Sequence, residues 1–198
     1  MTYARAEYYE TDQAVAHFVG RYSQAKERAF CRFIGRLLGT DAEVLEIGGG
    51  SGLHASMLAP MVRSYVHSDL SAAMCNHART LGLESRQVDG LNIRAPAKTI
   101  LAIELSTLRG DDAELRRRQL QEMARVADRI VISTARLGMH TMDRDDVRCL
   151  ADVGFRLRHW TSWGVIPTRF WPPVAGPMVE AAASALGLGL RRVALFSR

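Results

Sequence analysis

The residues of this chain most suited to chemistry lie in a glycine-rich stretch, "EVLEIGGGSG", at residues 43–52. An apolar run leads into the spacing Glu46-x-Gly48-x-Gly50-x-Gly52. Glycine tolerates a positive φ and lets a ligand approach the backbone more closely than a β-carbon would permit. A helix that begins near Gly52 would add free N–H groups and the positive end of its dipole. The stretch predicts a strand, a turn and a helix that together hold a polar ligand.

Two acidic residues follow at the ends of the next two expected strands. Asp69 comes just after the strand 64–68, and Asp89 comes just after the strand 85–88. An acid at the end of the second strand can accept hydrogen bonds from ribose hydroxyls, as in dinucleotide folds. An acid after the third strand could reach an exocyclic amine. Both have an ordinary interpretation as well, Asp69 as a helix cap and Asp89-Gly90 as a turn.

An alternating framework is needed to bring these residues together. The patterns predict strands at 43–47, 64–68, 85–88, 99–104, 129–134, 155–160 and 191–197. They predict helices at 52–59, 71–81, 112–127, 143–152 and 175–186, after a helical N-terminal segment. Ser71 should cap the second helix, and Asp111, with Glu114 three residues on, should open the third. Strands that alternate with helices indicate an α/β fold with a mostly parallel sheet covered on both faces.

Length and composition fit one domain. The chain has 198 residues, of which 47% are hydrophobic, and no linker divides it. We expect a helical cap at 1–40 and a core at 41–198, with a candidate lid insertion at 161–187. Three widely spaced cysteines suggest no disulfide framework and no metal site, so a reducing cytoplasm fits best. No apolar stretch suits a signal peptide or a bilayer span, so no membrane partner is expected.

The basic surplus is small, with 26 Lys and Arg against 21 Asp and Glu. Its densest cluster, Arg116-Arg117-Arg118, lies in the amphipathic helix expected at 112–127, where a solvated outer face explains it. Nucleic acid is therefore not the expected partner.

The motifs resemble those of class I S-adenosylmethionine-dependent methyltransferases, particularly the group that acts on small molecules. The resemblance rests on "VLEIGGGSG", on "SDLSAAM" and on "LQEMARVADRIVIS", and it covers residues 40–135 in order. More weakly, the tail 155–198 is similar to the family's final antiparallel strand pair with an insertion. The resemblance implies a Rossmann-like, doubly wound, seven-stranded sheet with an antiparallel last strand. It also implies S-adenosylmethionine as cofactor and S-adenosylhomocysteine as product.

The same resemblance implies a set of cofactor-binding residues. Glu46 and the glycines would hold the methionine part, Asp69 the ribose, and Asp89 with Gly90 the adenine. Either Leu70 or Met74 would pack on the adenine face. The implied set is Glu46, Gly48, Gly49, Gly50, Asp69, Leu70, Met74, Asp89, Gly90 and Glu104.

Glu104 belongs to this set because of a departure from the family. Many relatives carry an acid at the head of the fourth strand, where this chain has Lys98 and Thr99. The nearest acid is Glu104, at the other end of that strand. It could face the amino group of the cofactor, the acceptor or solvent.

Methyl transfer from a sulfonium is an in-line displacement, so alignment contributes most and only a hydroxyl acceptor benefits from a general base. His140, in the loop "GMHTMDRDD", is the first candidate base, although such a histidine can equally be solvated. Candidates for contact with the acceptor stand before the domain and after the fourth strand. They are Tyr8, Tyr9, His17, Tyr22 and Ser106.

The segment "HWTSWGVIPTRFWPP" concentrates tryptophan and proline. It suggests a rigid aromatic lid over a flat or apolar acceptor, formed by Trp160, Trp163 and Trp171. Arg169 could pair with a carboxylate or phosphate of that acceptor. A packed connection at the sheet edge or a contact in a homodimer would explain the segment equally well.

Methylation of a small organic acceptor, as in a tailoring step of specialised metabolism, is the favoured function. A fold of this type without methylation is one alternative. A nicotinamide-dependent enzyme is another, because Gly50-x-Gly52-x-x-Ala55 matches the dinucleotide fingerprint, although that register gives Glu46 no role. An RNA methyltransferase is the least expected alternative.

Overall fold

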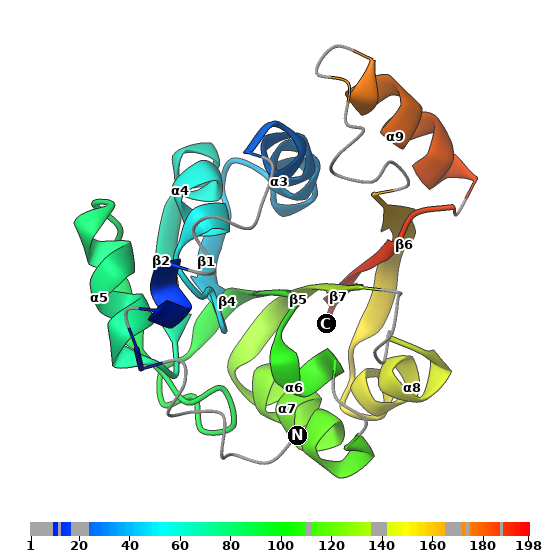
Figure 1. The fold of residues 1–198 in the computed structure, drawn as a ribbon. Helices are drawn as coiled ribbons and strands as arrows, with labels where there is room; N and C mark the ends of the chain where they lie inside the picture. Colours follow the sequence, from blue (N-terminus) through cyan, green and yellow to red (C-terminus); the bar gives the residue numbers. More distant parts are fainter. Residues whose placement is uncertain are drawn as a thin grey trace.

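A seven-stranded sheet forms the centre of the molecule (Figure 1). The computed structural model describes residues 10–11, 13–16, 24–109, 112–135, 142–164, 172, 175–186 and 188–198. The strands are β1 (Glu43–Glu46), β2 (Ser64–Asp69), β3 (Ser85–Gln87), β4 (Ala97–Ile103), β5 (Ala127–Ala135), β6 (Arg156–Trp163) and β7 (Arg191–Ser197). Their order is β3-β2-β1-β4-β5-β7-β6, and only β7 runs antiparallel to its neighbours. The expected mostly parallel, doubly wound sheet with an antiparallel last strand is confirmed.

Helices cover both faces of the sheet. They are α3 (Gln24–Leu38), α4 (Leu53–Leu58), the 3-10 helix η2 (Ala59–Met61), α5 (Ala72–Thr80), α6 (Ser106–Arg109), α7 (Ala113–Val126), α8 (Arg144–Asp152) and α9 (Gly176–Ala185). In Figure 1, α3 and α4 lie on one side of the sheet, and α6, α7 and α8 lie on the other. None of the helices in the described part of the chain is long and apolar enough to cross a membrane.

Alternate side chains of β4 explain this layering. Ile100 and Ala102 pack into the cluster formed with α7 and α8. Leu101 and Ile103 point the other way, into the cluster formed with α3 and α4. Because successive strand side chains face opposite sides, a central strand with apolar residues throughout must be covered twice. All four side chains are at most 5% exposed, so β4 lies in the middle of the core.

The helix starts follow the capping residues, with one correction. Ser71 caps α5, and its hydroxyl accepts a hydrogen bond from Met74 N at 3.1 Å, as expected. Helix α7 is capped by Asp112, whose carboxylate accepts from Leu115 N at 2.9 Å. The expectation that Asp111 opens this helix was therefore wrong. Both residues are aspartates, and the helix begins one residue later than the pattern indicates.

The C-terminal insertion begins later than its composition suggests. Strand β6 continues to Trp163, three residues past its expected end at Trp160, because it pairs with β7 along its whole length. Trp163 is 4% exposed and packs into the core on the side of α3. The assignment of Trp160 and Trp163 to a lid was therefore wrong, since both lie in a strand of the sheet. Trp171 lies outside the described residues.

Candidate functional site

The glycine turn lies at the topological switch point of the sheet. Strand β1 stands between β2 and β4, and the chain winds outward from it in both directions. In such folds ligands bind beyond the carboxyl ends of the strands at this point. Gly48, Gly50 and Gly52 have φ values of 71°, 57° and 80°. Any other residue would be strained there, which explains the spacing of the motif.

Asp69, at the end of β2, ties that turn to its own strand. Its Oδ2 accepts a hydrogen bond from Gly50 N at 2.9 Å, and its Oδ1 accepts one from Ser71 N at 2.9 Å. A carboxylate offers about four acceptor positions. Asp69 therefore organises the backbone and keeps acceptor capacity for the hydroxyls of a ligand.

His67 contacts the same turn from within the sheet. It was not identified as a site residue from the sequence. The residue is fully buried in β2, and its Nε2 lies 3.0 Å from the carbonyl oxygen of Gly50. Because a carbonyl only accepts, Nε2 must carry the hydrogen, and Nδ1 then accepts from the Ser85 hydroxyl at 2.8 Å. Burial lowers the pKa of His67, in keeping with a neutral ring. A lone polar residue inside the apolar run "YVHS" was the available signal.

Glu46 places a buried carboxyl group directly beneath the turn. Its side chain is 1% exposed, and Oε2 has no hydrogen-bond partner among the described residues. Burial, as the largest effect, and the negative charge of Asp69 together raise the pKa of Glu46 to about 8, against the opposing effect of the Tyr65 hydroxyl. A group with this pKa is mostly protonated at neutral pH.

The first three of the four glycines between β1 and α4 meet different surroundings. A β-carbon at Gly48 would collide with the Leu105 side chain, and one at Gly49 would lie 2.5 Å from Glu46 Oε2. A β-carbon at Gly50 would have no atom within 4 Å. The open side of the turn is therefore at Gly50, where a ligand can approach the backbone.

The loop after β3 packs beside the residue that follows β1, Ile47. Asp89 is exposed, and its Oδ1 accepts from Leu91 N at 2.9 Å, which closes a turn. Gly90 packs tightly, since a β-carbon there would lie 2.8 Å from Ile47 Cγ2. The buried side chain of Gln119 on α7 donates to the carbonyl of Gly90. Gln119 thus fixes this loop, a role that nothing in the sequence indicated.

The two apolar candidates near Asp69 differ in accessibility. Leu70 is 44% exposed, whereas Met74 is 1% exposed. Leu70 is therefore the one that offers an accessible surface to a ring.

Glu104 lies just after β4 and points toward β7. Its φ of 55° is the only positive φ of a non-glycine residue in the described ranges. Its Oε1 lies 3.7 Å from Arg191 Nε. Strained backbone of this kind clusters at functional sites.

Arg191 is the centre of a buried polar cluster at the carboxyl edge of the sheet. Its guanidinium donates to both carboxylate oxygens of Glu27 on α3, at 2.9 and 3.0 Å, and lies 4.6 Å from the ring centroid of Phe30. His54 Nε2 lies 2.9 Å from Glu27 Oε2. Burial opposes ionisation of Glu27, but the hydrogen bonds from His54 and Arg191 outweigh it and lower its pKa to about 2.

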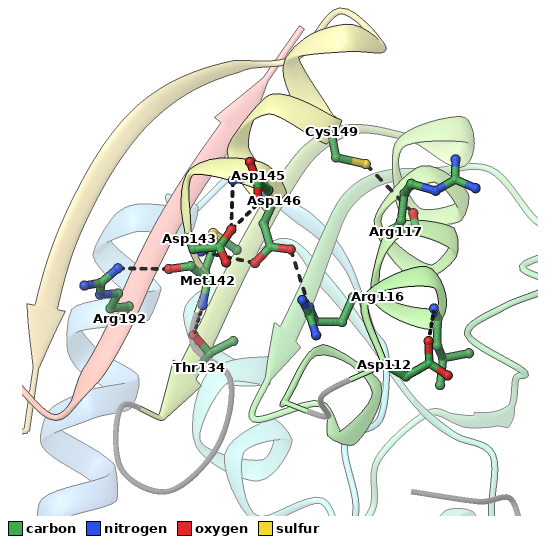
Figure 2. A network of polar contacts seen from close by, with 11 residues as sticks. Asp112, Arg116, Arg117, Thr134, Met142, Asp143, Asp145, Asp146, Cys149 and Arg192 are labelled. Atoms are coloured by element: carbon green, nitrogen blue, oxygen red, sulfur yellow. Dashed lines mark hydrogen bonds and ion pairs between the residues drawn. The ribbon is translucent and has the colours of Figure 1, made fainter.

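Figure 2 shows how the residues flanking segment 136–141 are held. Met142 N donates to the Thr134 hydroxyl at 3.1 Å, and Arg192 donates to the Met142 carbonyl at 3.0 Å. Asp143 then caps α8 in a capping box with Asp146. The chain therefore leaves and re-enters the described structure at the carboxyl end of β5.

Seven candidates for contact with the acceptor or for catalysis lie outside the described residues. They are Tyr8, Tyr9, His17, Tyr22, His140, Arg169 and Trp171. Ser106 is described; it is exposed and begins α6, the short helix after β4 that the sequence patterns did not predict.

No family model and no curated protein matches this chain, but solved structures do. N-methyltransferase NodS from Bradyrhizobium japonicum WM9, with bound S-adenosylhomocysteine, matches with a TM-score of 0.67 and 14% identity, over 99% of this chain and 97% of NodS. Magnesium protoporphyrin IX methyltransferase from Synechocystis PCC 6803, with bound S-adenosylmethionine, matches with a TM-score of 0.61 and 19% identity, over 86% and 76%.

The [4+2]-cyclase SpnF also matches, with a TM-score of 0.61 and 17% identity, over 86% of this chain and 81% of SpnF. The chain therefore has the Rossmann-like fold of S-adenosylmethionine-dependent methyltransferases, as the sequence motifs implied.

Proposed function

We propose that this protein transfers a methyl group from S-adenosylmethionine to a small organic acceptor. One observation carries the proposal. The open glycine turn at Gly50, the carboxylate of Asp69 and the buried carboxyl group of Glu46 meet at the switch point of a methyltransferase fold. A bare structural turn would need neither the open side at Gly50 nor the orphaned oxygen of Glu46.

The residues fit the three parts of this cofactor. Asp69 has acceptor capacity left for the ribose hydroxyls, and Gly50 leaves room for close approach to the backbone. Glu46 offers a carboxyl oxygen to the amino group of the methionine part. Leu70, with the loop of Asp89 and Gly90, flanks the place for adenine. When bound, the cofactor supplies a methyl group on a sulfonium, which a nucleophile displaces in line.

The acceptor would lie over the carboxyl ends of β4 and β5. Glu104 directly follows β4, and the segment that carries His140 follows β5. We propose that Glu104 faces this region, held by Arg191, and that His140 serves as base for a hydroxyl acceptor. A small-molecule acceptor is also supported by the similarity to magnesium protoporphyrin IX methyltransferase, whose name gives a small molecule as its acceptor. A tailoring role in the cytoplasm is the setting that we propose.

A fold of this type without methylation is the second candidate, because SpnF is a cyclase with a comparable fold. It predicts cofactor binding without turnover. Both candidate functions therefore predict that the cofactor binds, and only the first predicts that its methyl group is transferred to an acceptor.

Calorimetric titration with S-adenosylmethionine, S-adenosylhomocysteine and NAD tests the cofactor first. We expect both adenosyl ligands to bind and NAD not to bind. Asp69→Asn should weaken binding by roughly tenfold or more, because it removes the charge that favours the ribose hydroxyls. Asp41→Asn is the matched control, since Asp41 forms only an exposed ion pair with Arg63. An acceptor screen with labelled methyl groups follows. Binding of NAD alone would contradict the proposal.

A further inference from the structure

Glu46 combines nearly complete burial with a position against the glycine turn. Its Oε2 has no partner among the described residues and lies 2.5 Å from the place of a Gly49 β-carbon. Since glycine has no such atom, the oxygen lies directly against the backbone of the turn.

The groups that face Glu46 come from β2 and α3. Strand β2 contributes the Tyr65 hydroxyl, the neutral His67 ring and the Asp69 carboxylate, and α3 contributes the Cys31 thiol, whose pKa is raised mainly by burial. On β4 the paired residue is Leu101. Tyr65 forms no hydrogen bond of normal geometry with Oε2. Among the described residues, therefore, no cation compensates an ionised Glu46, and Asp69 repels it.

A buried carboxylate without a compensating charge is costly, so the neutral acid is the stable form until a cation arrives. The proposed cofactor carries such a cation in the ammonium group of its methionine part. On the basis of the proposed function, we infer that Glu46 is protonated in the ligand-free protein and loses its proton when this ammonium group binds.

The exchange balances in atoms and charge. The O–H bond of the Glu46 carboxyl breaks, and its proton passes to solvent. The ammonium group keeps its three hydrogens and donates one of them to the new carboxylate. Glu46 thereby selects ligands that carry an amino group. The pKa of about 8 in the ligand-free protein supports this, because the proton is then present at pH 7.

Calorimetry with S-adenosylhomocysteine at pH 7, in phosphate and in Tris, counts the protons. The two buffers differ in their heat of ionisation, so a released proton makes the apparent binding enthalpy differ between them. We expect about one proton released per ligand. Affinity should rise by about tenfold per pH unit from pH 6 toward pH 8 and level off above it.

Two controls isolate Glu46. Glu46→Gln keeps the shape of the side chain but cannot titrate, so its binding enthalpy should not depend on the buffer. 5′-Methylthioadenosine lacks the amino-acid end, so it should bind the unaltered protein without releasing a proton. This second control holds even if Glu46→Gln fails to fold.

The outcomes separate the inference from the proposed function. Binding of S-adenosylhomocysteine without proton release would overturn the inference and leave the proposed function standing. Equal proton release by Glu46→Gln, or by 5′-methylthioadenosine, would also overturn it, because another group would then be the source. Failure of every adenosyl ligand to bind would overturn both.

Discussion

The carboxylate of Asp69 accepts a hydrogen bond from the backbone N–H of Gly50 at 2.9 Å, across 19 positions of sequence. The residue that we propose for the ribose thus also holds the glycine turn in place. Substitution of Asp69 should therefore lower both the stability of the protein and its affinity for the ligand.

Asp69→Ala should lower the free energy of unfolding by about 1–3 kcal/mol, because the N–H groups of Gly50 and Ser71 lose their acceptor. Asp69→Asn keeps one acceptor oxygen and should cost less. Urea denaturation without ligand measures this effect apart from affinity. Equal stability of Asp69→Ala and the unaltered protein would show that the carboxylate does not organise the turn.

Gly50→Ala should abolish most of the affinity for S-adenosylhomocysteine at a small cost in stability. Gly50 has a φ of 57° and open space around its β-carbon position, so strain of about 1 kcal/mol is the only folding cost. Gly39→Ala is the matched control, with a φ of 82° and equally open space at the end of α3. Equal affinity of both variants would contradict the assignment of Gly50 to the ligand.

Gly48→Val should destabilise the ligand-free protein by more than Gly39→Ala, by about 2 kcal/mol or more. The added side chain collides with the side chain of Leu105 even when no ligand is bound. Thermal unfolding without ligand measures the difference. Leu105→Ala in the same chain should restore part of the loss, and no restoration would argue against this contact.

Glu27→Gln should destabilise the protein by about 3 kcal/mol at pH 7, because the largely buried guanidinium of Arg191 loses the carboxylate charge of Glu27. The pKa of Glu27 is lowered to about 2, so its contribution is present above about pH 4.5 and is lost as pH falls toward 2. Unfolding curves from pH 7 to 3 should therefore converge for the two proteins. Glu43→Gln, which breaks only partly exposed pairs, should change little.

Glu46→Gln should show the opposite dependence on pH. The pKa of Glu46 is raised from 4.5 to about 8, so the folded state binds more protons than the unfolded state between these values. The unaltered protein therefore loses stability as pH rises from about 5 to 8. Glu46→Gln should not share this loss. At pH 9 its free energy of unfolding should therefore rise relative to that of the unaltered protein by on the order of a few kcal/mol. If urea denaturation gave the same difference in free energy of unfolding between the two proteins at pH 6 and at pH 9, the prediction would be contradicted.

The order of strands and helices could be predicted because it depends on local patterns. The apolar runs at β4 and β5 and the cap at Ser71 are each visible within a few residues of sequence. The choice between Asp111 and Asp112 could not be made, because either carboxylate can cap and the tertiary packing of α7 fixes its first turn. The extent of β6 was equally hidden, since pairing with β7 decides it.

The candidate site was predictable in part. Glu46, the glycines and Asp69 follow a motif that can be read along the chain, and the fold brings them together. The pair of Glu27 and Arg191 joins residues 164 positions apart, so no local pattern could reveal it. His67 and Gln119 likewise act on backbone atoms of distant loops, a role that any polar side chain of suitable reach could fill.

The anchoring of Met142 by Thr134 and Arg192 has a consequence for how this protein can change. Both anchors, and the capping box that follows, use atoms outside segment 136–141. The six residues of that segment can therefore be replaced without loss of the contacts that fix its ends. The same boundaries mark where a loop from a protein of the same fold can be grafted with these contacts kept.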